Sequence, residues 1–563
     1  MKTHFVRFLA VLLISALIVP ALDAREPIYA RKAMVVAEQD LATEVGVSVL
    51  RSGGNAVDAA VAVGLALAVT HPYAGNIGGG GFMLIRMADG RTTFIDFREK
   101  APAAATHDMY LNANGVPTGD SVVGWRSAGV PGTVRGLALA NKKYGREAWP
   151  ELVKPAVALA TNGFPVSKWQ MDSWRRSSPL LSQFPESKRT FLKGGAYYDW
   201  QEIFKQPELA RTLDRIAHLG AADFYDGETA HILAAEMAKN GGLITLADLQ
   251  NYQAVERTPL EGDYQGYHII SSPPPSSGGL GLLQMLAMLN GTGYDKSGAG
   301  SALSYHYMAE AMRRYFADRS KYLGDPDFVN IPISALLAPA YVDSRRATIR
   351  PDRATPAEQI APGLTAANEG TNTTHYSIVD QEGNAVAVTY TLNNGYGSGV
   401  TVPGAGFLLN DEMDDFAAKP GGPNMFGLVQ GESNAIAPGK RPLSSMTPTI
   451  ILKDGKPFLV LGAPGGPVII TSMLQVILNV IDFGMNAQDA IDFPRIHDQW
   501  KPDRLDTEST VSPDTVAQLR HMGYQTQTAD PNEKARVEVI LISAGWLQGA
   551  VDGRGGGGKA EGY

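Results

Sequence analysis

In the first half of the chain, apolar residues recur at helical spacing. The pattern is clearest over residues 55–70, 230–239 and 304–319. An apolar face that repeats every three to four residues predicts a helix packed against a core. The second stretch runs into an Asn-Gly-Gly sequence, and glycine after a periodic run is a helix stop signal.

Farther along, the pattern changes to β-prone runs separated by short turns rich in glycine, asparagine or aspartate. The paired runs cover residues 376–379 with 385–392, 449–453 with 458–461, and 537–542 with 546–548. Two such runs around a short turn predict a β-hairpin. Helices and antiparallel strands in one chain favour an α+β layered fold. The pattern alone does not define the topology, and no internal repeat is visible.

The N-terminus has the layout of a secretory signal. Basic residues precede an apolar run over 8–19, and mostly small residues follow up to Ala24. We expect cleavage after Ala24, with Ala21 as the alternative. An uncleaved anchor is a further alternative, but the run is short for a span of about 20 residues. We therefore predict a signal peptide over 1–24 and an exported mature chain, periplasmic or secreted, with no stable membrane span.

Composition narrows the functional classes. The 563-residue chain has a formal net charge of −8 and no cysteine, so neither a broad basic face for nucleic acid nor a thiol nucleophile is expected. The ten histidines are scattered, without metal-ligand spacing. Residues 553–559 have P-loop spacing, but Ala560 replaces the hydroxyl residue that would hold magnesium. We expect no metal and no cofactor.

The main chemical signal is Thr373. Residues 350–370 are rich in proline, alanine and small polar residues and are typical of an exposed linker, and a β-prone run begins directly after them. A threonine at such a junction becomes a new N-terminus if the linker is cut, and its own α-amine can then act as its general base. A free α-amine has a reference pKa of about 7.7–8.0, so part of it is unprotonated near neutrality. The alternative is that 371–377 are only the polar lead-in to an edge strand.

His375 is a second candidate base. In an extended strand it would share a face with Thr373 but lie about 6–7 Å further along. The α-amine of Thr373 is much closer to the hydroxyl, so we predict a packing role for His375.

Six motifs follow one another along the chain. They are Gly75-Asn76-Ile77-Gly78-Gly79-Gly80-Gly81-Phe82, Asp96-Phe97-Arg98-Glu99, Pro273-Pro274-Pro275-Ser276-Ser277-Gly278-Gly279, Thr373-Thr374-His375-Tyr376-Ser377, Arg441-Pro442-Leu443-Ser444-Ser445-Met446 and Pro464-Gly465-Gly466. In type, order and spacing they resemble the γ-glutamyltranspeptidase family of N-terminal-nucleophile hydrolases. The resemblance runs over nearly all of the mature sequence.

The resemblance implies a four-layer αββα sandwich and a precursor cut between Asn372 and Thr373. The products would be a large subunit over 25–372 and a small subunit over 373–563, intertwined in one domain. Thr373 would be the nucleophile. Thr391 would orient it, and the backbone amides of Gly465 and Gly466 would form the oxyanion hole. Without the resemblance, Thr391 could be an ordinary strand residue and the glycine pair a plain turn.

The resemblance also implies how a γ-glutamyl donor is held. Arg98, Ser444 and Ser445 would bind its α-carboxylate, and Asn393, Glu412 and Asp415 would bind its α-ammonium. Taken alone, Arg98 and the acidic cluster would instead be interpreted as solvated surface charges.

Two departures from the family pattern concern the rim of the site. Pro467 and Val468 follow the glycine pair where many family members have Ser-Arg, and Phe426 stands in the lid-like loop 423–428 where relatives often have tyrosine. Proline removes one amide but leaves those of the two glycines. Phenylalanine can cover a pocket but cannot donate a hydrogen bond to it.

The implied activity is γ-glutamyl transfer and hydrolysis, with glutathione or a related γ-glutamyl amide as donor and water, an amino acid or a peptide as acceptor. The nearest alternative is a cephalosporin-type acylase that releases a glutaryl group. Because a glutaryl donor has no ammonium, Arg98, Glu412 and Asp415 favour the zwitterionic donor. An inactive exported amino-acid-binding protein is an alternative from another class, and the intact Thr373 argues against it.

Overall fold

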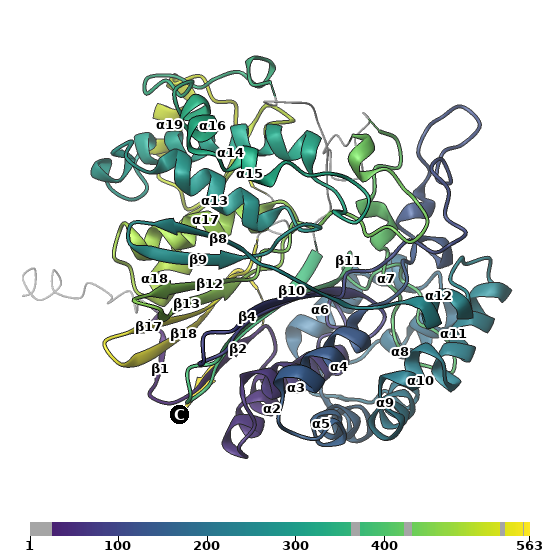
Figure 1. The fold of residues 1–563 in the computed structure, drawn as a ribbon. Helices are drawn as coiled ribbons and strands as arrows, with labels where there is room; N and C mark the ends of the chain where they lie inside the picture. The colour runs from purple at the N-terminus through teal and green to yellow at the C-terminus, as the bar shows by residue number, and fades with distance from the viewer. Residues whose placement is uncertain (1–24, 362–371, 421–430, 530–534, 556) are drawn as a thin grey trace, which may run out of the picture.

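The computed structural model of the chain describes residues 25–361, 372–420, 431–529, 535–555 and 557–563 (Figure 1). The predicted signal peptide, the end of the predicted linker and the lid residue Phe426 lie outside these residues. Among the helices that the structure describes, none is both long enough and apolar enough to cross a bilayer.

Two antiparallel sheets form the centre of the molecule (Figure 1), each with seven strands among the described residues. The first has the order β1 (Ile28–Ala30), β18 (Trp546–Val551), β17 (Glu538–Ser543), β13 (Lys456–Gly462), β12 (Thr449–Lys453), β9 (Tyr267–Ser271) and β8 (Leu260–Tyr264). The second has the order β19 (Lys559–Gly562), β2 (Met34–Ala37), β10 (Asn372–Val379), β11 (Ala385–Asn393), β3 (Gly80–Arg86), β4 (Thr92–Asp96) and β7 (Val255–Arg257). Both sheets therefore combine strands from before and after Thr373.

Helices cover the outer face of each sheet (Figure 1). The second sheet carries α2 (Asp40–Arg51), α3 (Ala56–Thr70) and α4 (Thr133–Tyr144), with α5 (Trp149–Asn162), α9 (Pro207–Leu219) and α11 (Glu228–Lys239) beyond them. The first sheet carries α13 (Gly278–Leu289), α17 (Val468–Ile481) and α18 (Ala487–Asp492), with α14 (Ala302–Tyr322) and α16 (Pro339–Arg346) packed on α13. The result is the predicted four-layer αββα arrangement.

Burial on both faces explains why β2 and β3, inside the second sheet, are almost continuously apolar. Along β2, Val35 and Ala37 belong to the core formed with the helices, whereas Met34 and Val36 belong to the core shared with the first sheet. Side chains of successive strand residues point to opposite faces, so each strand contributes to two cores.

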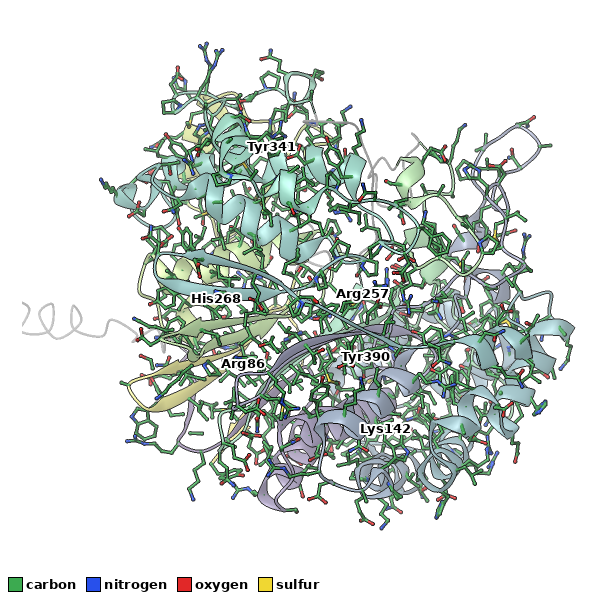
Figure 2. All side chains as sticks on the ribbon, viewed as in Figure 1. Arg86, Lys142, Arg257, His268, Tyr341 and Tyr390 are labelled. Carbon is green, nitrogen blue, oxygen red and sulfur yellow. The ribbon has the colours of Figure 1, made fainter. Side chains whose placement is uncertain are left out.

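Helix α3 anchors the hairpin that begins with Thr373. Each of its residues is buried, as expected for a helix that is apolar all round. The hydroxyl of Tyr376 donates to the carbonyl of Ala60 (3.0 Å), and that of Tyr390 (labelled in Figure 2) donates to the carbonyl of Gly64 (2.9 Å). A Cβ on Gly64 would lie 2.7 Å from the Tyr376 hydroxyl, so glycine allows this close approach.

The elements predicted from the pattern are confirmed, with small shifts at their ends. Helix α3 starts one residue after Asn55, whose side chain caps it in a capping box. The predicted helices near 230–239 and 304–319 correspond to the longer α11 and α14. The three hairpins correspond to β10–β11, β12–β13 and β17–β18.

Candidate active site

Apart from Phe426, which lies outside the described residues, the predicted site residues lie at one end of the sandwich. His375 on β10 lies against Gly462 of β13, because a Cβ on that glycine would be 2.2 Å from the imidazole ring. At the other end of the same strands, Val379 and Lys456 line one cavity. β10 and β13 therefore run in opposite directions across the sheet interface, and the chain after Gly462 continues toward Thr373.

Thr373 lies opposite a β-bulge in β11. The register of β10 against β11 pairs Asn372 with Asn393 and Thr374 with Tyr390, so Thr373 opposes both Thr391 and Leu392. A bulge re-aims a side chain and interrupts the ladder at that point. Thr373 is 5% exposed, so the predicted nucleophile is a buried hydroxyl beside Thr391.

The turn beyond β11 is fixed by hydrogen bonds. The backbone N–H of Asn393 donates to Thr391 Oγ1 (2.8 Å), and its side-chain amide donates to the carbonyl of Asp411 (3.0 Å). Asn393 itself has a φ of 75°, an uncommon conformation for a residue other than glycine. These contacts connect the predicted orienting threonine to the acidic segment 411–415.

Asn76 supports Thr391 from the other side. Its side-chain amide donates to the carbonyl of Thr391 (2.8 Å), and its side-chain oxygen accepts from the N–H of Gly79 (2.9 Å). A Cβ on Gly79 would lie 2.0 Å from the same Thr391 carbonyl, so the glycine is required for this approach. Asn76 lies within one of the six motifs, but its role was not predicted from the sequence.

Arg98 and the acidic residues meet in a buried cluster. The guanidinium of Arg98 donates to Glu412 and to Asp415, and also to the carbonyls of Pro442 (3.2 Å) and Leu443 (3.1 Å). Arg98 and Glu412 are each 1% exposed, so the alternative of solvated surface charges is wrong. The family resemblance implied that Arg98 and the acids bind different groups of a ligand, whereas in the structure they pair with one another.

Glu99 is a further carboxylate of this cluster, and its role was missed. Its Oε2 lies 3.6 Å from Arg98 Nη1, and neither of its oxygens has a hydrogen-bond partner among the described residues. Burial raises the pKa of Glu99 to about 7. Burial also raises the pKa of Glu412 well above its usual range, although Arg98 opposes the shift. With carboxylates in excess over the guanidinium, the cluster is short of positive charge. An additional ammonium group would fit there.

Further ion pairs hold the end of β4, two residues before Arg98. Asp96 accepts from the backbone N–H of Arg98 (2.9 Å) and from Nε of Arg257 (2.7 Å), a residue labelled in Figure 2. Arg441 Nε lies 3.4 Å from the same carboxylate. The 96–99 and 441–446 motifs are thus held side by side.

The glycine pair lies in the loop between β13 and α17. Gly465 and Gly466 have φ values of 133° and 56°, and a Cβ on Gly465 would lie 2.8 Å from Cα of Ala535. Residues with side chains rarely adopt such conformations, so glycine is needed here for its backbone. Pro467 precedes the first residue of α17, where its missing N–H leaves no helical bond unmade.

Ser444 and Ser445 lie in the irregular segment before β12, and both are buried. The Oγ of Ser444 accepts from the N–H of Met446 (3.2 Å), and the Oγ of Ser445 accepts from Arg319 Nη2 at 3.5 Å. Arg319, on α14, was also missed, since a single arginine in a long helix carries no distinctive signal.

His375 is enclosed between the sheets. Its ring nitrogens contact the hydroxyls of Thr389 (2.8 Å) and Ser377 (2.9 Å), and burial lowers its pKa to about 3. These contacts agree with the predicted packing role. No cluster of metal-ligating side chains occurs in the described part of the chain.

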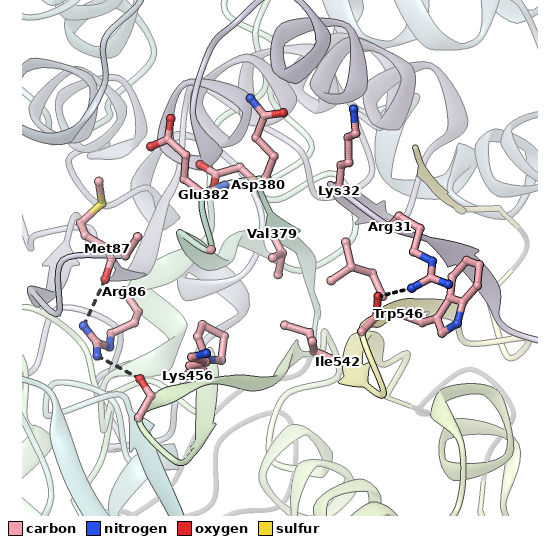
Figure 3. A pocket seen from close by; sticks show the side chains of 17 residues that line it. Arg31, Lys32, Arg86, Met87, Val379, Asp380, Glu382, Lys456, Ile542 and Trp546 are labelled. Atoms are coloured by element: carbon pink, nitrogen blue, oxygen red, sulfur yellow. Dashed lines mark hydrogen bonds between the residues drawn. The ribbon is translucent and has the colours of Figure 1, made fainter.

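A separate cavity of about 450 Å³ lies at the far end of the β10–β11 hairpin (Figure 3). Its lining includes Arg31, whose guanidinium lies 3.5 Å from the centre of the Trp546 ring, and Lys456. It contains none of the predicted site residues.

A threonine on an inner strand of an αββα sandwich, at the end of a linker, defines the class of N-terminal-nucleophile hydrolases. The model of the γ-glutamyltranspeptidase family matches residues 42–562, and the chain belongs to this family. It is 49% identical over 534 residues to a glutathione hydrolase proenzyme of Pseudomonas sp. (strain A14), covering 94% of this chain and 92% of that protein.

The acylases on the same fold are more distant in sequence. An acylase ACY 1 proenzyme of Pseudomonas sp. (strain V22) is 36% identical over 501 residues, covering 88% of this chain and 87% of that protein. The solved cephalosporin acylase from Bacillus halodurans has a TM-score of 0.85 at 28% identity, covering 97% of this chain and 98% of that chain. The fold is therefore shared by both activities and does not discriminate between them.

Proposed function

We propose that this chain is the precursor of a γ-glutamyltransferase and glutathione hydrolase that cuts itself between Asn372 and Thr373. The products are a large subunit over 25–372 and a small subunit over 373–563, after loss of the signal over 1–24 on export to the periplasm or outside the cell. The observation that carries the proposal is the buried Thr373 opposite the β11 bulge that contains Thr391, at the end of the sandwich that holds Arg98.

In the catalytic cycle, the α-amine of Thr373 takes the proton of its own hydroxyl as Oγ attacks the γ-carbonyl carbon of the donor. The negative charge that develops on the carbonyl oxygen is stabilised by the amides of Gly465 and Gly466, and one such donor contributes about 3–4 kcal/mol. The C–N bond then breaks, the α-ammonium gives its proton to the leaving amine, and a γ-glutamyl ester of Thr373 remains.

The second half of the cycle releases the acyl group. Water or the amine of an amino acid or peptide gives a proton to the α-amine and attacks the ester carbon. The Thr373 oxygen leaves with that proton, which gives glutamate or a new γ-glutamyl amide. Because either acceptor can enter, an added dipeptide is expected to raise the rate of donor amine release wherever deacylation limits turnover.

The donor's charged groups are matched by the buried cluster. The α-ammonium is held by Glu412, Asp415 and Asn393, and the α-carboxylate by Arg98, Ser444 and Ser445. Ligand entry exchanges part of the Arg98 pairing for the α-carboxylate and leaves the acids to the ammonium.

The deciding experiment is an intact-mass measurement of the purified mature protein. We expect two fragments, with Thr373 as the N-terminus of the smaller one. The Thr373→Ala variant should remain one chain and lack activity. A wild-type chain that is single, intact and fully active contradicts the proposal.

The second candidate is a glutaryl-releasing cephalosporin acylase, favoured by the similarity in fold to the Bacillus halodurans enzyme. The buried carboxylates around Arg98 argue against it, since a glutaryl group brings no ammonium to neutralise them. A wild-type preference for a glutaryl over a γ-glutamyl anilide would favour the acylase.

A further inference from the structure

The serine pair is held in place by a second segment behind it. The chain at Pro275–Ser277 runs beside Ser444: the N–H of Ser444 donates to the carbonyl of Pro275 (2.8 Å), and the N–H of Ser277 donates to the carbonyl of Ser444 (2.6 Å). The hydroxyl of Ser277 donates to the same carbonyl (2.8 Å). A Cβ on Gly278 would lie 1.9 Å from Thr447 Oγ1, so the two segments are in direct contact.

Helix α14 supports both segments through two side chains one turn apart. The hydroxyl of Tyr315 donates to the carbonyl of Ser277 (2.6 Å), and Arg319 Nε donates to Ser277 Oγ (3.0 Å). Arg319 Nη2 reaches Ser445 Oγ at 3.5 Å. Arg319 is 1% exposed, so a single buried guanidinium contacts the serine pair both directly and through Ser277.

The direction of these hydrogen bonds matters for ligand binding. A guanidinium has donors only, so a serine that bonds to it must act as the acceptor. The Oγ of Ser445 accepts from Arg319, and the Oγ of Ser444 accepts from the N–H of Met446. Each hydroxyl must therefore direct its own proton to another acceptor, and a carboxylate is a strong one.

The positions of the two arginines also support a role for Arg319 in binding a carboxylate. Arg98 is already paired with Glu412 and Asp415, which lowers its availability to a ligand carboxylate. Arg319 places a second guanidinium beside the serines.

We propose that Arg319 is a positioning and specificity residue for the donor's α-carboxylate. It orients Ser445 directly and Ser444 through Ser277, and the hydroxyls held in this way select donors whose α-carboxylate is free and ionised. This inference rests on the proposed function, because it concerns recognition of the same γ-glutamyl donor.

The test compares two donors, γ-glutamyl anilide and its α-methyl ester, on wild type and variants. Arg319→Ala should raise KM for the free acid by about 10-fold or more and change kcat less, because the lost contacts act mainly on binding. Its KM for the ester should change little, so the preference for the free acid should fall by about the same factor. Arg319→Lys keeps the charge but not the planar fork and should restore part of the preference.

Arg314→Ala is the matched control. Arg314 is on the same helix and equally buried, but it bonds to Glu310 (2.7 Å) and Thr348 (2.7 Å), and none of its hydrogen bonds among the described residues reaches Ser277 or the serine pair. It should change yield or stability and leave the donor preference as in wild type. Ser277→Ala should lower the preference in the same direction as Arg319→Ala, by a smaller factor.

A donor preference that stays at the wild-type value in Arg319→Ala overturns the inference. If that variant does not fold, an unchanged preference in both Arg319→Lys and Ser277→Ala overturns it equally. A loss of preference in Arg314→Ala as large as in Arg319→Ala also overturns it. Failure of wild type to turn over γ-glutamyl anilide would instead contradict the proposed function, so the two failures are distinguishable.

Discussion

At the scale of single residues, the site is built by burying charges that would otherwise be solvated. Arg98, Glu99 and Glu412 are almost completely withdrawn from water. Burying a charge is costly unless it is paired, and here the carboxylates exceed the guanidinium. The residue-level consequence is a cluster whose protonation changes with pH and with ligand binding.

Glu99 gives this cluster a pH dependence. Its pKa rises from an ordinary 4.5 to about 7 on folding because burial disfavours the charged form. A raised carboxylate pKa means that the folded state binds more protons than the unfolded state between these two values. The contribution of Glu99 to stability is therefore present below pH 4.5 and is lost as pH rises to 7.

Glu99→Gln should flatten the fall in stability over this pH window. The measurement is the urea midpoint of wild type and variant at several pH values across it. Glu358→Gln, at an exposed position, is the control and should leave the wild-type slope unchanged. Equal slopes for wild type and Glu99→Gln would contradict the assignment.

Asp415 provides the prediction on donor recognition. Losing one charged partner in an enclosed site costs about 2–5 kcal/mol, so Asp415→Ala should lower kcat/KM for γ-glutamyl anilide by about 30-fold or more. Turnover of glutaryl anilide, which lacks the ammonium, should not fall. Arg98→Ala should lower the γ-glutamyl rate similarly, and both variants should still be cut at Thr373.

The control for Asp415→Ala is Asp414→Asn, a neighbouring buried acid whose carboxylate accepts from the hydroxyl of Ser121 (2.7 Å). The rate of Asp414→Asn shows how much a general disturbance of the acidic segment 411–415 lowers turnover. An unchanged γ-glutamyl rate in Asp415→Ala would mean that a group other than Asp415 binds the ammonium of the donor.

At the scale of elements, the β10–β11 hairpin, which contains Thr373, depends on close contact between the two sheets. Gly462 of β13 lies under the His375 ring of β10, and the ring is held by the hydroxyls of Thr389 and Ser377. The imidazole of His375 is uncharged near neutral pH, because burial lowers its pKa to about 3. It therefore fills the interface without a counter-charge.

Gly462→Ala tests this contact. The added Cβ would lie 2.2 Å from the ring, and overpacking a tight core costs about 1–3 kcal/mol. We expect a lower Tm and a lower rate of self-cutting, because β10 must shift. Gly119→Ala, which meets nothing within 4 Å, should leave both unchanged. A wild-type Tm for Gly462→Ala would mean that the sheets are not in contact there.

At the scale of the whole molecule, the proposed cut separates two intertwined pieces. β10 and β11 follow the cut, and they pair with β2 and β3, which precede it. In the other sheet, β12 pairs with β9 and β18 with β1 across the same division. Each sheet is therefore continuous only when both pieces are present.

The cut protein should therefore stay together without a covalent link. We expect both fragments to co-elute in size-exclusion chromatography even at about 1 M salt, where exposed charges are screened within about 3 Å. They should separate only in denaturant. Elution of the fragments apart in native buffer would contradict the intertwined arrangement.

Much of the fold could be predicted from the sequence, which also suggested the nucleophile that we propose. The helix over 56–70 and the three hairpins follow from local periodicity and turn residues, which constrain the backbone wherever the segment lies. Thr373 was predicted to be the nucleophile because a predicted linker meets a strand there and because its segment resembles a family motif. The acids and serines around it came from their resemblance to a known family.

Only the tertiary structure decided which of these residues meet. Arg98 and Glu412 are 314 residues apart in the chain, and their contact results from β4 and the end of β11 finishing at the same edge. The bulge at Thr373 and the approach of Arg319 to Ser445 depend in the same way on how sheets and helices pack. Local pattern encodes backbone geometry and burial, whereas long-range partners are selected by packing, which no single segment contains.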